Sequence, residues 1–97
     1  MNPPNSYAIY CLLSQKTNWI YVGMTSNLKD RIQRHSNGYE KTTKPYRPFL
    51  LIELAVAFNR TEARRIEKWF KTSYGKEIIK NLPPPFHGGI TGLSADR

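Results

Sequence analysis

Only one of the first 27 residues, Lys16, is charged, so this third of the chain has little to present to water. Residues 6–14 (SYAIYCLLS) are β-branched, aromatic and apolar, which predicts a buried strand. Residues 15–18 are polar and predict a turn, and the alternation in residues 18–24 (NWIYVGM) predicts the return strand of a hairpin. We therefore expect the chain to begin with a β-hairpin.

The rest of the pattern predicts helices around one further strand. We expect a helix from the N-cap candidates 25–27 to about His35, then a basic loop over 38–47 and a strand over 48–58. A second helix is expected from about Glu62 to Tyr74, capped by Asn59 or Thr61 and stopping near Gly75. A short third helix is expected to end at Lys80. This order, β-β-α-β-α-α with an antiparallel start, predicts an α+β fold in which one small sheet is flanked by helices.

A length of 97 residues predicts a single domain. The run Pro83-Pro84-Pro85 is expected to end regular structure, because proline removes a backbone donor and fixes φ. We therefore assign residues 1–82 to the domain and residues 83–97 to a loose tail rich in proline and glycine.

The charge pattern indicates a polyanionic partner and excludes several other classes. Lys and Arg outnumber Asp and Glu by 15 to 7, a net charge of +8, and residues 28–48 alone carry six bases and two acids. The apolar runs are too short to span a membrane, and the start of the chain does not resemble a secretory signal. One cysteine, Cys11, suits the reducing cytoplasm, and two histidines argue against a multi-histidine metal site.

One carboxylate occupies an unexpected position. Ala63, Ile66 and Phe70 form the apolar stripe of the predicted helix 62–74, and Glu67 falls on the same stripe. A carboxylate there is costly unless a cation or a hydrogen-bond network meets it. Glu67 is therefore either a functional group or the partner of a neighbouring base at the edge of the stripe.

Two tyrosines and two basic groups form the complementary pattern. If Leu13 pairs with Asn18, Tyr10 pairs with Tyr21 and both phenols lie on one face of the sheet. Arg31 and His35 are neighbours four residues apart on the first helix. Each of these residues alone is as well explained by packing or solvation. Together with a misplaced carboxylate in a basic domain, they suit phosphodiester hydrolysis, which needs a base, a cation and a metal ion.

These residues resemble the signature of the GIY-YIG nucleases over roughly residues 6–82. Ala8-Ile9-Tyr10 and Tyr21-Val22-Gly23 resemble the two signature tripeptides, with Ala8 in place of a glycine and Val22 in place of an isoleucine. Residues 27–31, followed by His35, resemble the helix that bears the family's arginine. Residues 62–68 resemble the helix that bears its metal-binding glutamate, and Asn81 stands at the place of an asparagine that supports the site.

The resemblance implies an α/β sandwich on a three-stranded antiparallel sheet, and cleavage of DNA with one divalent ion, Mg²⁺ or Mn²⁺. Tyr10 would activate the water, helped by Tyr21 or His35, and which of the three is the general base stays open. Arg31 would stabilise the transition state, and Glu67 would hold the ion against the leaving 3′ oxygen. One carboxylate is a weak site until phosphate oxygens and water complete it. Backbone or substrate is expected to pass close to Gly23.

The expected substrate is duplex or branched DNA, bound mainly through its phosphates, and a protein partner could supply specificity. The cations assigned to this contact are Lys29, Arg34, Lys41, Lys44 and Arg47. Similar domains occur in homing endonucleases, the excision-repair incision subunit, restriction enzymes and resolvases. Two alternatives are a binding module on the same fold that does not cut or cuts only with a partner, and a small RNA-associated basic protein, which the lack of an aromatic RNA-stacking motif disfavours.

Overall fold

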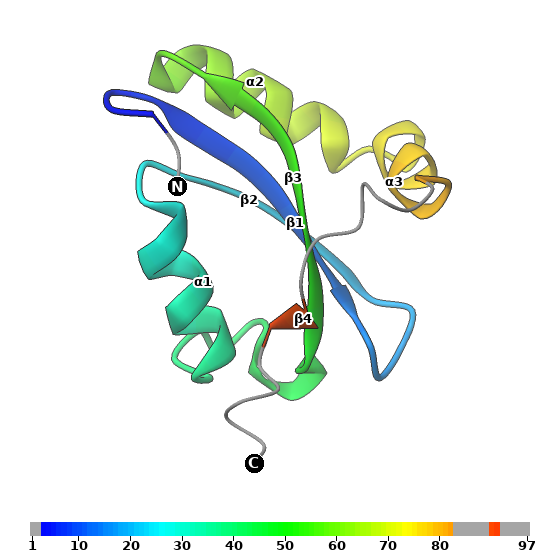
Figure 1. The fold of residues 1–97 in the computed structure, drawn as a ribbon. Helices are drawn as coiled ribbons and strands as arrows, with labels where there is room; N and C mark the ends of the chain where they lie inside the picture. The colour runs from blue at the N-terminus through cyan, green and yellow to red at the C-terminus, as the bar shows by residue number, and fades with distance from the viewer. Residues whose placement is uncertain (1–2, 83–89, 92–97) are drawn as a thin grey trace.

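The computed structural model describes residues 3–82 and 90–91, and Figure 1 shows their arrangement. The elements in chain order are β1 (Tyr7–Ser14), β2 (Ile20–Thr25), α1 (Leu28–Ser36), the 3₁₀ helix η1 (Lys44–Tyr46), β3 (Phe49–Ala57), α2 (Arg60–Phe70), α3 (Ser73–Lys80) and β4 (Ile90–Thr91). The predicted α+β class and the β-β-α-β-α-α order over residues 7–80 are confirmed. No helix among the described residues is both long and apolar enough to cross a membrane.

The sheet has the strand order β2-β1-β3-β4, and every neighbouring pair is antiparallel. Its three long strands are those predicted. The two-residue strand β4 was not predicted, and at Ile90 and Thr91 the expectation of a loose tail is wrong. These residues pair with Leu50 and Phe49 on β3, whose outer edge otherwise offers free backbone donors and acceptors. The other residues of the expected tail lie outside the described residues.

The hairpin register differs from the predicted one. Leu13 pairs with Ile20 rather than with Asn18, because the backbone N–H of Ser14 donates to the carbonyl of Trp19 at 3.0 Å. The Ser14 hydroxyl also accepts two backbone N–H groups of the turn, which stabilises a loop of four residues. The predicted register was therefore wrong by two residues.

A shift of two residues leaves every side chain on its predicted face, because side chains alternate along a strand. Tyr10 lies opposite Gly23, and Tyr21 lies opposite Leu12, two residues further along β1. The prediction that both phenols lie on one face of the sheet is confirmed, and their ring centroids are 6.2 Å apart.

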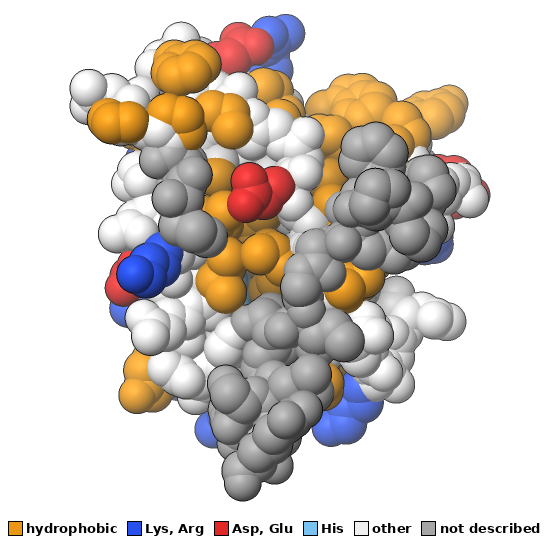
Figure 2. Space-filling view, viewed as in Figure 1, with side chains coloured by type: hydrophobic (Ala, Val, Ile, Leu, Met, Phe, Trp, Pro, Cys, Tyr) orange, Lys and Arg blue, Asp and Glu red, His pale blue; other side chains and the backbone are white. Residues whose placement is uncertain are grey.

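β1 is the central strand, and its two faces belong to two different hydrophobic clusters. On one side it packs beneath α1, and on the other beneath α2 and α3 (Figure 1). The buried residues on the α1 side are Ala8, Tyr10, Leu12, Leu28 and Phe49. The buried residues on the α2 side are Ile9, Cys11, Val22, Ile52, Ala57, Ala63 and Ile79. Figure 2 shows one face of the molecule, on which hydrophobic side chains occupy much of the middle and Lys and Arg lie at the margins.

The predicted helix 62–74 ends four residues early and a second helix begins at once. α2 ends at Phe70, and α3 starts after Thr72, whose hydroxyl accepts the backbone N–H of Gly75. A Cβ on Gly75 would lie 2.4 Å from the Cα of Phe70, so only glycine allows this close turn. Gly75 therefore packs the start of α3 against the end of α2 rather than terminating a long helix. Asn59 is the N-cap of α2.

Candidate functional site

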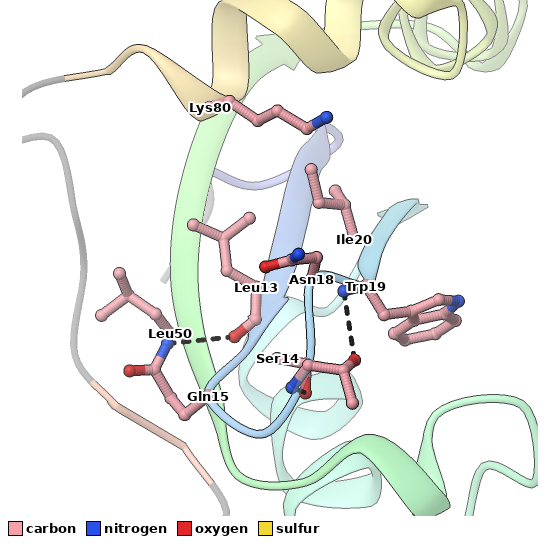
Figure 3. A pocket seen from close by; sticks show the side chains of 9 residues that line it. Leu13, Ser14, Gln15, Asn18, Trp19, Ile20, Leu50 and Lys80 are labelled. Carbon is pink, nitrogen blue, oxygen red and sulfur yellow. Dashed lines mark hydrogen bonds between the residues drawn. The ribbon is translucent and has the colours of Figure 1, made fainter.

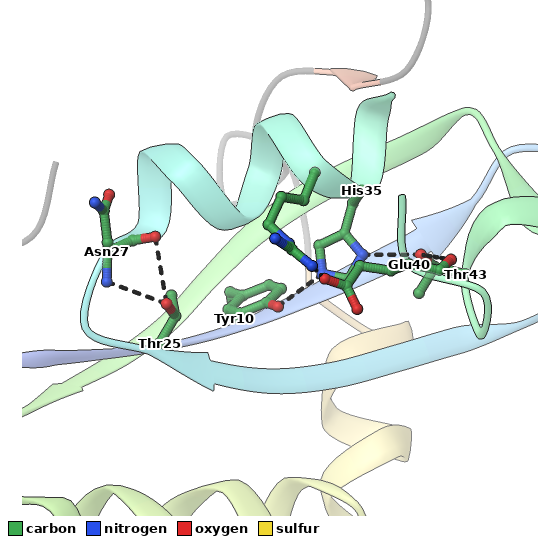
Figure 4. A network of polar contacts seen from close by, with 7 residues as sticks. Tyr10, Thr25, Asn27, His35, Glu40 and Thr43 are labelled. Atoms are coloured by element: carbon green, nitrogen blue, oxygen red, sulfur yellow. Dashed lines mark hydrogen bonds and ion pairs between the residues drawn. The ribbon is translucent and has the colours of Figure 1, made fainter. Parts of the chain in front are cut away.

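A tyrosine and a histidine meet in the interior between β1 and α1. The Tyr10 hydroxyl lies 2.8 Å from Nε2 of His35, and neither residue has measurable exposure to solvent (Figure 4). Tyr10 belongs to the central strand, whereas His35 occupies the last turn of the helix that covers it. The fold therefore joins two residues 25 positions apart that the sequence placed on separate elements.

The histidine's second nitrogen fixes its tautomer. Nδ1 of His35 lies 2.8 Å from the hydroxyl oxygen of Thr43, which is itself fully buried (Figure 4). The Thr43 hydroxyl has one proton and donates it to the backbone carbonyl of Glu40 at 3.3 Å. It therefore accepts from Nδ1–H of His35, and Nε2 is left without a proton to accept the O–H of Tyr10.

Burial governs the protonation of this pair. It lowers the pKa of His35 to about 4, against the opposing effect of Glu40, so the imidazole is neutral at pH 7. Burial also raises the pKa of Tyr10 above its ordinary value; the neighbouring Tyr21 adds to this shift. The positive charge of Arg31 favours the Tyr10 phenolate, but burial outweighs it.

The histidine gives a testable pH dependence of stability. A histidine titrates near 6.5 in an unfolded chain and at about 4 in this fold, so between these values the folded state binds fewer protons. The free energy of unfolding must therefore fall as the pH drops through this window. At 1.36 kcal/mol per pKa unit the loss attributable to His35 is about 3 kcal/mol.

Urea unfolding at pH 7, 5 and 4 measures this loss, with His35→Gln as the matched variant. The loss between pH 7 and pH 4 should be smaller in the variant by about that amount, because carboxylates titrate equally in both proteins. Equal losses in the two proteins would show that His35 is not buried in its neutral form.

Tyr21 and Gly23 complete the aromatic part of the cluster. A side-chain hydrogen bond joins Tyr21 to Tyr10, and the Tyr21 ring centroid lies 5.2 Å from that of His35. A Cβ on Gly23 would lie 2.8 Å from the Tyr10 hydroxyl oxygen and 2.9 Å from the ring of Tyr21. The nearest neighbours of this glycine are therefore the two phenol side chains, rather than the backbone or substrate that we expected. Tyr10 is fully buried whereas Tyr21 is partly exposed, so Tyr21 lies nearer to solvent.

Arg31 lies on α1, one turn before His35, and is partly buried. Its charge acts on the cluster directly, since it lowers the pKa values of Tyr10, His35 and Glu40. The structure thus brings together four of the five residues predicted for catalysis, two from the hairpin and two from α1.

The fifth residue, Glu67, comes from the other layer. It is buried on α2, as predicted, at 7% exposure, and α2 packs on the sheet face opposite to α1. Its carboxylate lies 3.4 Å from the ammonium of Lys71, one turn further along the helix. The alternative expectation, a pair with a neighbouring base, is therefore met in this structure.

The donor set fits a divalent ion only in the company of substrate. The described residues contain no group of three or more His, Cys, Asp or Glu side chains placed to bind a metal ion. Glu67 supplies one hard oxygen ligand and is already paired with a cation. Mg²⁺ is commonly held by one or two carboxylates together with substrate phosphates and water, so Glu67 fits that pattern and no more extensive one.

Of the other predicted residues, some are free to contact a ligand and some are engaged in the fold. Lys29, Lys41 and Lys44 are exposed, and no ion pair involves them in the described part of the chain. Arg34 donates to Glu40 at 2.7 Å, and Arg47 donates to the backbone carbonyl of Ser36 at 2.9 Å. Asn81 is the C-cap of α3 and its amide donates to the carbonyl of Glu77.

The sequence reasoning missed Thr43, which holds the imidazole. Threonine is common in loops, and no spacing rule links residue 43 to His35.

An open hollow between the hairpin turn and α3 is shown in Figure 3. The described residues that line it are hydrophobic side chains, the polar turn and Lys80, with no acid or histidine among them, so they do not supply the groups that hydrolysis needs.

Comparison with known proteins identifies relatives. Residues 6–81 match the family described as the GIY-YIG catalytic domain. The chain is 29% identical over 87 residues to UvrABC system protein C of Wolbachia sp. subsp. Brugia malayi, covering 87% of this chain but only 13% of that protein. It is 32% identical over 77 residues to UPF0213 protein SH2523 of Staphylococcus haemolyticus, covering 78% of this chain and 89% of that protein. No solved structure gives a significant match.

Proposed function

This chain belongs to the GIY-YIG family, and we propose that it is an endonuclease that hydrolyses phosphodiester bonds of DNA. The observation that carries the proposal is the buried pair of Tyr10 and neutral His35 beside the cation Arg31. Binding through charge alone requires no such pair. The similarity to a UvrABC system protein supports DNA as the substrate and DNA repair as the setting. Residues 1–82 form the proposed nuclease domain, and a cytoplasmic location suits the free, buried Cys11.

We assign the contact with the attacking water to Tyr21, because Tyr10 has no exposed surface. As water attacks, its proton passes to the Tyr21 oxygen, the Tyr21 proton to Tyr10, and the Tyr10 proton to Nε2 of His35. The resulting hydroxide forms a bond to phosphorus, the bond to the 3′ oxygen breaks, and the 3′ oxygen takes a proton from solvent. Nε2 of the neutral His35 has a free lone pair that takes this proton, and because burial disfavours the imidazolium, the proton stays there only while the bonds to phosphorus change.

Positive charge completes the mechanism. Arg31 lies beside the phenols, where a guanidinium stabilises both a transient phenolate and the charge on the phosphoryl oxygens. Glu67 would hold the divalent ion, Mg²⁺ or Mn²⁺, which would supply charge stabilisation for the leaving 3′ oxygen. Thr43 is a positioning residue, because it orients His35 without contacting substrate.

The direct test is incubation of purified protein with labelled duplex, branched and single-stranded DNA in Mg²⁺, Mn²⁺ or chelator. We expect cleavage of duplex or branched DNA with either ion and none with chelator. Cleavage that persists in chelator would refute the metal requirement.

A second function has one specific observation in its favour. Glu67 is paired with Lys71 on the α2 layer, apart from the cluster beneath α1. A module that binds DNA and cuts only when a protein partner completes the site would have this arrangement. DNA binding without cleavage under any of the conditions above, followed by cleavage on addition of cell extract, would favour this function over the first.

Binding should be mainly electrostatic and depend weakly on sequence. Log affinity for duplex DNA is expected to fall linearly with log salt concentration, by about 0.9 for each phosphate neutralised. Replacing Lys29, Lys41 and Lys44 with glutamine should flatten the slope by about 2 to 3 units, because all three are exposed. The matched control is Lys76→Gln on α3. An unchanged slope in the triple variant would remove these lysines from the interface.

A further inference from the structure

The outer side of α2 carries a second concentration of positive charge that the proposed mechanism does not use. Arg60, Arg64, Arg65 and Lys68 are all exposed, and together with Thr61 they line an open groove. α2 and α1 cover opposite faces of the sheet (Figure 1). The groove is therefore a surface separate from the lysines on and after α1.

Most of this charge is not neutralised by neighbouring acids. In the described part of the chain, the ion pairs of this helix join Arg65 to Glu62 and Lys71 to Glu67. Arg60, Arg64 and Lys68 have no ion pair there and follow one another at four-residue spacing, about 6 Å apart along the axis. Like charges at this spacing destabilise a helix, and an anionic ligand along the groove would relieve that repulsion.

An exposed aromatic ring follows the groove residue Lys68 on the same helix. Trp69 is 46% exposed, although tryptophan is usually well buried. With Arg65 and Ile66 it lines a second, smaller hollow, and Arg65 also lines the groove. The cationic groove and the hollow with an indole in its wall therefore share Arg65.

We infer that the outer side of α2 binds a single strand of nucleic acid, with phosphates along Arg60, Arg64 and Lys68 and a base stacked on Trp69. A charged groove beside an aromatic platform is the usual arrangement for single strands. A duplex has its bases stacked on one another and offers none to an indole. The inference rests on the proposed function for the identity of the polymer and adds a contact for an unpaired segment of the same substrate.

The chain's two tryptophans, Trp19 and Trp69, allow a direct test. Trp19→Phe keeps a ring stacked on Tyr46 and leaves Trp69 as the single indole. We expect oligothymidylate, added without divalent metal, to quench the fluorescence of this variant. In anisotropy with labelled oligothymidylate, Trp69→Ala should weaken binding by at least about 5-fold, the lower end for loss of one base–aromatic stack.

Charge variants test the phosphate contacts. Replacing Arg60, Arg64 and Lys68 with glutamine should reduce the salt slope for oligothymidylate by about 2, at about 0.7 per phosphate on a single strand. The matched control replaces Lys16, Lys76 and Lys80, three bases that belong to neither DNA-contacting surface, and it should keep that slope. Absence of quenching, or equal losses in the α2 variant and this control, would overturn the inference. The inference would also be overturned if a duplex of equal length competed for binding as effectively as the single strand does.

This test is separate from cleavage because it uses no divalent metal. If the wild-type protein cuts no DNA but oligothymidylate still quenches Trp69 and the α2 variants lose binding, the inference stands and the proposed nuclease function fails. If the α2 variants cut duplex at the wild-type rate and bind oligothymidylate as wild type does, the nuclease stands and the inference fails.

Discussion

Tyr21→Phe is expected to lower the rate of DNA cleavage at neutral pH by at least ~100-fold, the usual scale for losing a general acid–base group. The substitution keeps the ring that lies 6.2 Å from Tyr10 and removes the hydroxyl that we assign to the attacking water. Tyr10→Phe should also slow cleavage, because it removes the hydroxyl that joins Tyr21 to His35, but by less, since the Tyr21 phenol that contacts the water remains. Single-turnover cleavage of labelled duplex in Mg²⁺ measures both variants.

Two controls separate chemistry from folding. Thr43→Val removes the acceptor of the His35 Nδ1–H while keeping the side-chain shape, so it should slow turnover without weakening DNA binding, and Thr43→Ser should restore the rate. The opposite ranking of the two tyrosine variants would return the water contact to Tyr10. Near-normal rates in both would contradict the proton path and show that neither phenol is the general base.

Glu67→Gln is expected to lower cleavage by at least ~100-fold while leaving the fold intact. The amide keeps the size of the side chain but is a poor ligand for a divalent ion. The ion pair that it removes, to the largely exposed Lys71 at 3.4 Å, is worth no more than about 1 kcal/mol. Cleavage rate across a Mg²⁺ titration and urea unfolding measure the two effects.

Arg31→Ala should lower the cleavage rate by a similar factor.

Glu62 offers a matched control for Glu67 on the same helix. Its carboxylate is more exposed and pairs with Arg65, so Glu62→Gln should cut at close to the wild-type rate. A Glu67→Gln protein that cuts as fast as the Glu62→Gln protein would show that Glu67 is not the metal ligand, and would leave its burial beside Lys71 as its whole role.

The sequence predicted what local periodicity determines. The order of strands and helices, the burial of Glu67 and the shared face of Tyr10 and Tyr21 depend on which side of an element a residue occupies, and they are confirmed. The predicted end of α2 was wrong because Gly75 packs against the backbone of Phe70, and the position of Gly75 in the sequence does not reveal this contact.

The missing parts of the site are those that depend on distant contacts. Tyr10 is completely buried because α1 covers β1. This burial raises the pKa of Tyr10 by more than the charge of Arg31 lowers it. Thr43 acquires its role because the loop after α1 folds back under His35. Neither property has a signature in residue type or spacing.

The double-sided burial of β1 has a consequence for mutational surveys of this protein. Its residues from Ala8 to Leu12 are buried in two separate layers, although in this group only Tyr10 joins the proton path. A saturation library selected for activity would therefore find the whole segment intolerant to substitution. A count of intolerant positions along this strand would overstate the size of the catalytic centre, and only selection for folded protein alongside activity would separate the two causes.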